Sequence, residues 1–146
     1  MEIDDATIER VAQRIHDNYL ADHALAGPRW EDLTDDLQEA NRAQARDIAA
    51  KLATIGATVA PGPGPAAFAF TQPEVDRLAQ AEHRRWVDQR LRAGWTYDVA
   101  RNDATKQHPL LVPWDRLPET ERIKDRNAVR HIPDVLAGVG LHVVRS

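Results

Sequence analysis

Apolar residues recur at steps of three and four along four stretches of the chain, a period typical of amphipathic helices. The stretches cover residues 6–26, 34–56, 71–94 and 118–137, and each of the first three ends at or next to a glycine. Pro133 lies inside the fourth stretch and is expected to bend or split it. The pattern therefore predicts a mainly α-helical protein.

Local signals mark where these helices start and where the chain leaves helical structure. Thr34 is a predicted N-cap, and Thr71-Gln-Pro-Glu74 is a capping box with proline in the first turn. The alternating glycines and prolines of residues 60–66 predict an irregular linker. Three short apolar segments predict strands, namely ATV near residue 58, AFAF near residue 68 and LHVVR at the end of the chain.

The sequence also contains an internal repeat, which appears when the chain is aligned with itself at two fixed displacements. A displacement of 84 residues aligns one pair of tryptophans, two pairs of arginines, one pair of glycines and several apolar pairs. The aligned pairs are Trp30 with Trp114, Leu33 with Leu117, Arg42 with Arg126, Arg46 with Arg130, Ile48 with Ile132, Leu52 with Leu136, Gly56 with Gly140 and Val59 with Val143. A displacement of 67 residues aligns the first predicted helix with the third. The difference between the two places a 17-residue insertion at about residues 95–111 of the second copy.

We predict one domain over residues 1–146, in which a repeat at about 4–59 and a repeat at about 71–145 are joined by a linker at about 60–70. Neither repeat carries enough apolar surface for independent stability, so the two are expected to pack against each other. Duplicated units of this kind usually pack around a pseudo-two-fold axis.

Composition narrows the classes of function. The net charge of −4 disfavours binding to nucleic acid, and no apolar run approaches the roughly 20 residues needed to span a bilayer. The chain has no cysteine, and its first residues lack the basic and apolar regions of a signal peptide. We expect a cytoplasmic protein that binds neither nucleic acid nor membrane.

Glu82 interrupts the apolar stripe of the third predicted helix. A carboxylate on a core stripe is costly unless it is paired. Three interpretations follow: Glu82 pairs with an arginine or caps a loop by accepting from backbone groups of the insertion, it lines a polar pocket between the repeats, or it acts as a general base with a raised pKa.

Two pairs of residues occupy equivalent positions in the repeats: His16 with His83, and Tyr19 with Trp86. Such side chains are usually structural, but across a two-fold axis the two large rings would hold a planar group between them. The two histidines lack a third ligand, and the other histidines show no HxxxH or HExxH spacing, so no metal site is predicted.

The insertion is rich in polar groups, among them Tyr97, Arg101, Asn102 and Lys106. Insertions in one copy of a repeat form loops, and loops often carry function, although a solvated loop explains the same composition. Arg84 of the third helix is either a phosphate ligand or part of a solvated face. No GxGxxG, GxxxxGK[ST] or GxSxG motif is present, so neither an enzyme nor a cofactor is predicted.

Residues 81–140 are similar to the RyR domain, named after the repeats of ryanodine receptor calcium channels. The similarity rests on spaced elements that cover most of the second repeat, and Asp98 departs from the glycine that usually follows the second of them. The elements are Glu82-His83 followed by Trp86, GWTY at 94–97, Arg101-Asn-Asp103, HPL at 108–110, Leu117-Pro-Glu119 and Gly140. The resemblance implies a stand-alone bacterial member with two helical repeats about a pseudo-two-fold axis and a small two-stranded β element.

The resemblance also implies a ligand, because in the channels this domain is associated with adenine nucleotides held between aromatic residues of the two repeats. We expect a non-catalytic sensor of an adenine nucleotide or an ADP-ribose-type signal that acts on an effector protein. The base would stack between Trp86 and Tyr19, and Arg101 with Arg84 or Lys106 would meet phosphate. The predicted binding residues are Trp86, His83, Tyr19, Arg101, Glu82, His16, Tyr97, Lys106, Arg84 and Asn102.

Two other functions stay open. The first is a protein–protein interaction module, in which Trp30, Trp95 or Trp114 is an exposed anchor. The second is a hydrolase that uses Glu82 and His83 on a nucleotide.

Overall fold

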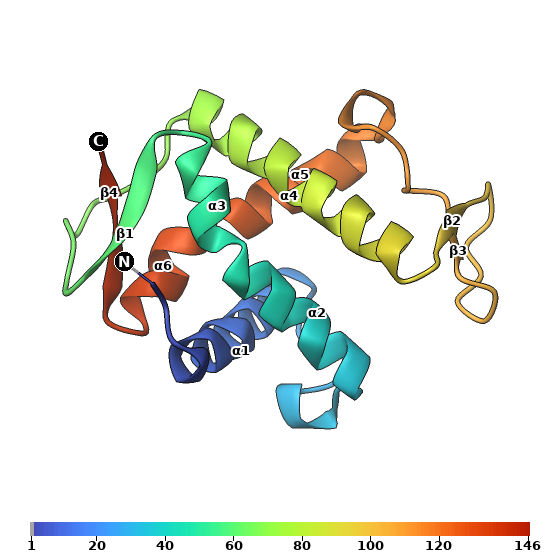
Figure 1. Cartoon of the computed structure of the whole chain (residues 1–146), viewed down its shortest axis with the longest axis horizontal. Helices are drawn as coiled ribbons and strands as arrows, with labels where there is room; N and C mark the ends of the chain where they lie inside the picture. Colours follow the sequence, from blue (N-terminus) through green and yellow to red (C-terminus); the bar gives the residue numbers. More distant parts are fainter. Residues whose placement is uncertain (1) are drawn as a thin grey trace.

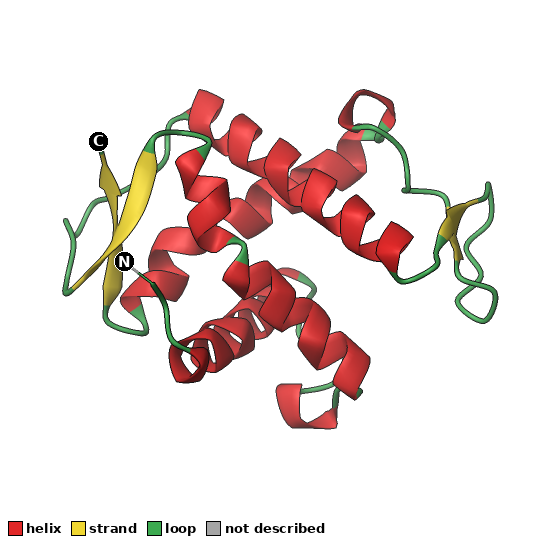
Figure 2. Ribbon diagram, in the orientation of Figure 1, coloured by secondary structure: helices red, strands yellow, loops and turns green. Residues whose placement is uncertain are grey.

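Helices make up most of the chain in the computed structural model, which describes residues 2–146 (Figures 1 and 2). The predicted mainly helical class is confirmed. The helices are α1 (Asp5–Asp22), α2 (Asp35–Arg46), α3 (Ile48–Ala53), α4 (Gln72–Arg92), α5 (Glu119–Arg130) and α6 (Ile132–Ala137). The strands are β1 (Ala57–Pro61), β2 (Thr96–Tyr97), β3 (Gln107–His108) and β4 (Leu141–Arg145), and two 3₁₀ turns lie at Trp30–Asp32 and Trp114–Arg116.

The same order of elements occurs twice along the chain. We call residues 5–61 (α1 to β1) the first half and residues 72–145 (α4 to β4) the second half. Each half contains a long helix, a 3₁₀ turn, two successive helices and a strand, and the second half adds β2 and β3 between its long helix and its 3₁₀ turn. The pseudo-two-fold relation between the halves stays a prediction.

The helix starts follow the local signals in the sequence. Thr34 accepts a hydrogen bond from the Leu37 amide at 3.3 Å, so it is the N-cap of α2. The capping box at the start of α4 is complete, because the Thr71 hydroxyl accepts from the Glu74 amide and the Glu74 carboxylate accepts from the Thr71 amide. These bonds satisfy amides that have no partner inside the helix.

The prediction of one continuous helix over residues 34–56 is wrong. The chain breaks at Asp47, whose amide bonds back to Ala43 and Ala45, and a new helix then turns Ile48 and Leu52 into the core. The fourth helical region breaks at the equivalent His131, and Pro133 lies in the first turn of α6, where its missing amide costs no hydrogen bond. The first break, at Asp47, contains no proline. The direction of the core therefore explains both breaks, and Pro133 alone does not account for the second.

Two strands from opposite ends of the sequence form an antiparallel pair. β1 and β4 pair over five residues, with Val59 opposite Val143, which confirms two of the predicted strands (Figure 1). The linker prediction is wrong at its start, because β1 extends to Pro61. This proline ends the strand at a position where no amide donor is needed. The strand predicted near residue 68 is also wrong: Phe68 and Phe70 instead pack edge to face at 5.3 Å against the core.

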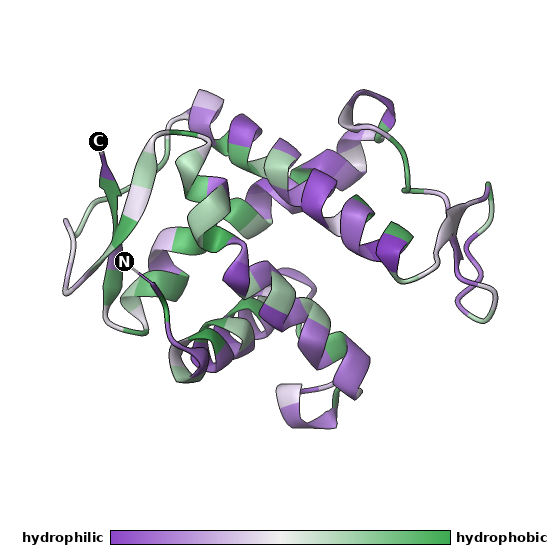
Figure 3. Cartoon of the chain, viewed as in Figure 1, coloured by the Kyte–Doolittle hydropathy of each residue, from purple (hydrophilic) through white to green (hydrophobic). Residues whose placement is uncertain are grey.

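Side chains of both halves form one hydrophobic core. Apolar residues concentrate over β1, β4, α3 and α6, whereas the far ends of α2 and α4 are more polar (Figure 3). The largest fully buried side chains are Ile48, Leu52, Leu78, Leu136, Val11 and Val129. Within residues 2–146, no helix is both long and apolar enough to cross a membrane.

Leu52→Ala and the equivalent Leu136→Ala each remove a fully buried side chain. We expect each to lower the free energy of unfolding by about 2–5 kcal/mol, because a cavity is left in the shared core. Urea denaturation measures this, with Leu91→Ala on the exposed side of α4 as a control that changes stability little. A loss below about 1 kcal/mol at either position would contradict a core common to both halves.

Candidate functional site

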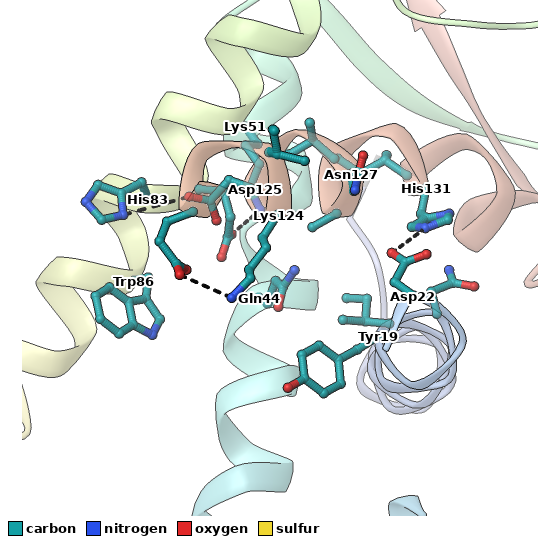
Figure 4. Close-up of a pocket in the computed structure, with 18 of the residues that line it drawn as sticks. Tyr19, Asp22, Gln44, Lys51, His83, Trp86, Lys124, Asp125, Asn127 and His131 are labelled. Carbon is teal, nitrogen blue, oxygen red and sulfur yellow. Dashed lines mark hydrogen bonds and ion pairs between the residues drawn. The ribbon is translucent and has the colours of Figure 1, made fainter. Parts of the chain in front are cut away.

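A cavity of about 620 Å³ lies between the two halves, lined by residues of all six helices (Figure 4). Ile48, Val135 and other apolar side chains line part of it, and a group of charged and amide side chains lines the rest. Pockets for small molecules have this range of volume and combine apolar surface with a few polar groups.

Two aromatic rings from opposite halves line the cavity. Figure 4 shows Tyr19 on α1 and Trp86 on α4, separated across the view. Tyr19 is 53% exposed and stacks on His23 with 4.1 Å between ring centroids, while Trp86 is half-buried and meets the edge of His108 at 5.0 Å. Both rings are held by neighbours and keep surface open to a ligand.

His16 and His83 each anchor a loop through a hydrogen bond to its backbone. Each is buried, and its Nε2 lies 2.7 Å from a backbone carbonyl, of Pro28 for His16 and of Val112 for His83. A carbonyl only accepts, so Nε2 of each ring carries the hydrogen and donates it. His83 therefore turns its Nδ1 toward the cavity wall, 3.9 Å from the Asp125 carboxylate, whereas His16 is not part of the cavity lining.

Glu82 is buried in an ion-pair network that joins the halves. Its carboxylate accepts from Lys51 Nζ of α3 at 2.7 Å and from two nitrogens of Arg85 at 2.9 and 2.7 Å. Burial acts to raise the pKa of Glu82, but the Lys51 and Arg85 charges and hydrogen bonds lower that pKa below its ordinary value. This pairing agrees with the first of the three interpretations of Glu82, and the carboxylate also lines the cavity.

Asp125 of α5 also lines the cavity and is not among the residues predicted from the sequence. Burial, together with the negative charges of Glu82 and Glu121, raises the pKa of Asp125 to about 7. Among residues 2–146 its carboxyl has no hydrogen-bond partner, and its nearest polar contact is the 3.9 Å approach to His83 Nδ1. A carboxyl in this state is protonated about half of the time near neutral pH.

The charges of the cavity lining are mainly negative. Asp22, Glu82, Glu121 and Asp125 line it, against two lysines, Lys51 and Lys124. Lys124 pairs with Glu121 at 3.2 Å, and Asp22 contacts His131 at 3.0 Å. Residues 2–146 contain no group of three histidine or carboxylate side chains placed to hold a metal ion.

Four of the ten predicted binding residues line the cavity: Tyr19, Glu82, His83 and Trp86. The insertion follows the end of α4 and forms the parallel pair β2–β3 at one end of the molecule (Figure 1). The residues outside the lining are His16, Arg84, Tyr97, Arg101, Asn102 and Lys106.

Most polar groups of the insertion satisfy one another or the nearby backbone. Arg101 pairs with Asp103 at 2.8 Å, Lys106 donates to the Ala93 carbonyl at 2.8 Å, and Asn102 accepts from two backbone amides. The insertion reaches the site through Leu110, which lines the cavity, and through His108 against Trp86.

Arg84 lies on a second hollow, of about 570 Å³, between α2, α3 and α4. Lys51 lines both this hollow and the cavity. The charged side chains that line the hollow are Arg46, Asp47, Lys51, Arg84, Arg85, Asp88 and Arg92.

The sequence did hold a signal for the missed Lys51. Lys51 interrupts the apolar stripe of Ile48 and Leu52, as Glu82 interrupts the stripe of the third predicted helix. Two opposite charges on two core stripes indicate a buried pair.

The fold and the site define a mainly helical domain with a cavity between its halves, lined by aromatic, apolar and charged side chains. A family model of the RyR domain matches residues 70–145, just over half of the chain. The chain therefore belongs to the RyR domain family. The matched segment carries Glu82, His83, Trp86 and Asp125, and the first half supplies Tyr19 and the other lining residues of α1, α2 and α3.

Lys51→Met leaves the buried Glu82 with Arg85 as its partner. We expect a loss of about 3–5 kcal/mol in the free energy of unfolding, as for other buried pairs broken on one side. Arg101→Ala, which breaks an exposed pair, is the control and should cost under about 1 kcal/mol. Equal effects of the two variants in urea denaturation would show that the buried pair is not important for stability.

Asp125→Asn tests the raised pKa. In the folded state the pKa is about 7, against 3.8 for the free side chain, so the folded protein holds the proton longer. Stability from this group is complete below about pH 4 and is lost as the pH rises to about 7. We expect Asp125→Asn to raise the melting temperature at pH 8 by several degrees more than at pH 5, while the exposed Asp103→Asn gives no such gain. A pH-independent effect of Asp125→Asn would contradict the raised pKa.

Proposed function

We propose that this RyR-domain protein is a non-catalytic binding module that takes an adenine nucleotide or an ADP-ribose-type molecule in the cavity between its halves. The observation that carries the proposal is a cavity of about 620 Å³ with Tyr19 of one half and Trp86 of the other on its walls. Stacking of a base on an aromatic side chain contributes about 1–3 kcal/mol per base. As a sensor, the protein would pass the state of this cavity to an effector protein.

The distribution of charge supports an orientation with phosphate outside the cavity. The lining holds more carboxylates than lysines, so phosphate groups would be repelled there. Arg90 lies over the Trp86 ring at 5.6 Å and over the Trp95 ring at 5.1 Å, and among residues 2–146 its guanidinium makes no hydrogen bond. Burial, and next the charge of Arg101, lowers the pKa of Arg90, so a nearby anion would relieve the repulsion between these two cations. Arg90 with Arg101 is the phosphate site that we favour.

The surroundings of the tryptophans support a cavity ligand over a protein partner. Trp30, Trp95 and Trp114 are each half-buried, and each lies under at least one arginine. A docking anchor would present an open apolar face. Glu82 is occupied by Lys51 and Arg85, which supports a binding role over catalysis by Glu82 and His83.

The test is a thermal-shift and calorimetric panel of AMP, ADP, ATP, cyclic AMP, NAD, ADP-ribose and cyclic ADP-ribose. A ligand present at 100 times its dissociation constant should stabilise the fold by about 2.7 kcal/mol. Trp86→Ala should weaken binding at least about tenfold, because a stacking surface is lost. Tyr97→Ala removes an exposed ring outside the cavity and is the matched control.

Two outcomes would overturn the proposal. The first is no shift with any ligand of the panel. The second is a Trp86→Ala protein that is folded and binds as tightly as the unchanged protein. Chromatography of the incubated ligands adds a third check, since turnover of a nucleotide would make the protein an enzyme.

A further inference from the structure

Asp125 differs from the other carboxylates of the cavity in having no partner. Each of the other three is engaged: Glu82 with Lys51 and Arg85, Glu121 with Lys124, and Asp22 with His131. Among residues 2–146 the Asp125 carboxyl makes no hydrogen bond, and its side chain is only 25% exposed. No buried side-chain oxygen of the described residues lacks a partner, so the oxygens of Asp125 are accessible and available to a ligand that enters the cavity.

The groups around Asp125 determine which kind of ligand atom its carboxyl can bind. His83 of α4 directs Nδ1 toward it, and because Nε2 of that ring donates to Val112, Nδ1 of the neutral ring is an acceptor. Glu82 of α4 and Glu121 of α5 add negative charge, while Lys51 of α3 and Arg85 of α4 offset part of it. The burial of Asp125 and these charges raise its pKa to about 7, so its protonated form, which both donates and accepts, is well populated.

The position of Asp125 is suited to hydrogen bonding with the edge of a base. Figure 4 shows its carboxyl beside His83, on the side of the cavity nearer Trp86 than Tyr19. A ring lying on Trp86 would turn one edge toward this carboxyl. Adenine presents an amino group as donor beside a ring nitrogen as acceptor on the same edge. A protonated carboxyl matches that pair with two hydrogen bonds.

We propose that Asp125 is a specificity-determining residue that forms a two-point hydrogen bond with the amino edge of adenine, so that the ligand enters base first and leaves its phosphates outside. The proposal rests on the proposed function. The carboxyl hydroxyl donates to a ring nitrogen, and the carboxyl oxygen accepts from the 6-amino group. No covalent bond changes.

The experiment compares two ligands on three proteins by calorimetry. AMP is compared with the monophosphate of purine riboside, which lacks the 6-amino group, on the unchanged protein, Asp125→Leu and Asp125→Asn. We expect the unchanged protein to prefer AMP by at least about fivefold, and Asp125→Leu to lose that preference, because one of the two hydrogen bonds depends on the amino group. Asp125→Asn should keep it, since an amide also donates and accepts beside adenine.

The pH dependence separates a direct contact from a structural role. Above pH 7 the unchanged protein loses the donated proton, so its affinity for AMP should fall by at least about fivefold between pH 7 and pH 8.5. Asp125→Asn has no proton to lose and should show a flat profile. This variant also controls for the phosphate of AMP and for Glu82, His83 and Glu121, which it leaves in place. If Asp125→Leu fails to fold, the profile of Asp125→Asn still decides.

The two proposals fail in different ways. If AMP does not bind the unchanged protein, the proposed function and this inference are both overturned. If AMP binds and depends on Trp86, but the unchanged protein and Asp125→Asn share one pH profile, only the role of Asp125 is overturned. The same holds if Asp125→Leu keeps the preference for the amino group.

Discussion

The arrangement of the site depends on one buried ion pair, between Lys51 of the first half and Glu82 of the second. Both side chains are almost fully buried, so removal of either one leaves the other charge buried with one partner fewer. The pair fixes α3 against α4 and forms part of the cavity wall. It also holds Glu82 near Asp125, and burial of Asp125, together with the negative charge of Glu82, raises the pKa of that second carboxyl.

The fold could be predicted from sequence wherever the cause is local. The caps at Thr34 and Thr71 and the strands at β1 and β4 depend on neighbouring residues, and the periodicity located the long helices. The break at Asp47 could not be predicted, because no proline or glycine marks it and its cause is the direction of the core. The strand expected near Phe68 is absent for a similar reason: no third strand is there to pair with it within residues 2–146.

The site could be predicted where one helix holds its residues together. Glu82 and Trp86 are four positions apart on α4, so they share one stripe, and the cavity includes both. Asp125 was missed because its unusual state comes from Glu82 and burial, which only the packed structure provides. Arg101 was expected to meet phosphate from the resemblance to the RyR domain; in the structure it lies outside the cavity lining and pairs with Asp103, so a bound phosphate would compete with that carboxylate.

The position of Lys51 between two hollows has a further consequence. Its side chain borders the cavity on one side and the hollow that holds Arg84 on the other. Lys51 is therefore a side chain that the two hollows share. Any molecule that strengthens or weakens the Lys51–Glu82 pair from one side changes the free energy of binding on the other, and the coupling energy is the same in both directions. The Lys51–Glu82 pair would thus couple ligand binding in the cavity to binding at the second hollow on the surface.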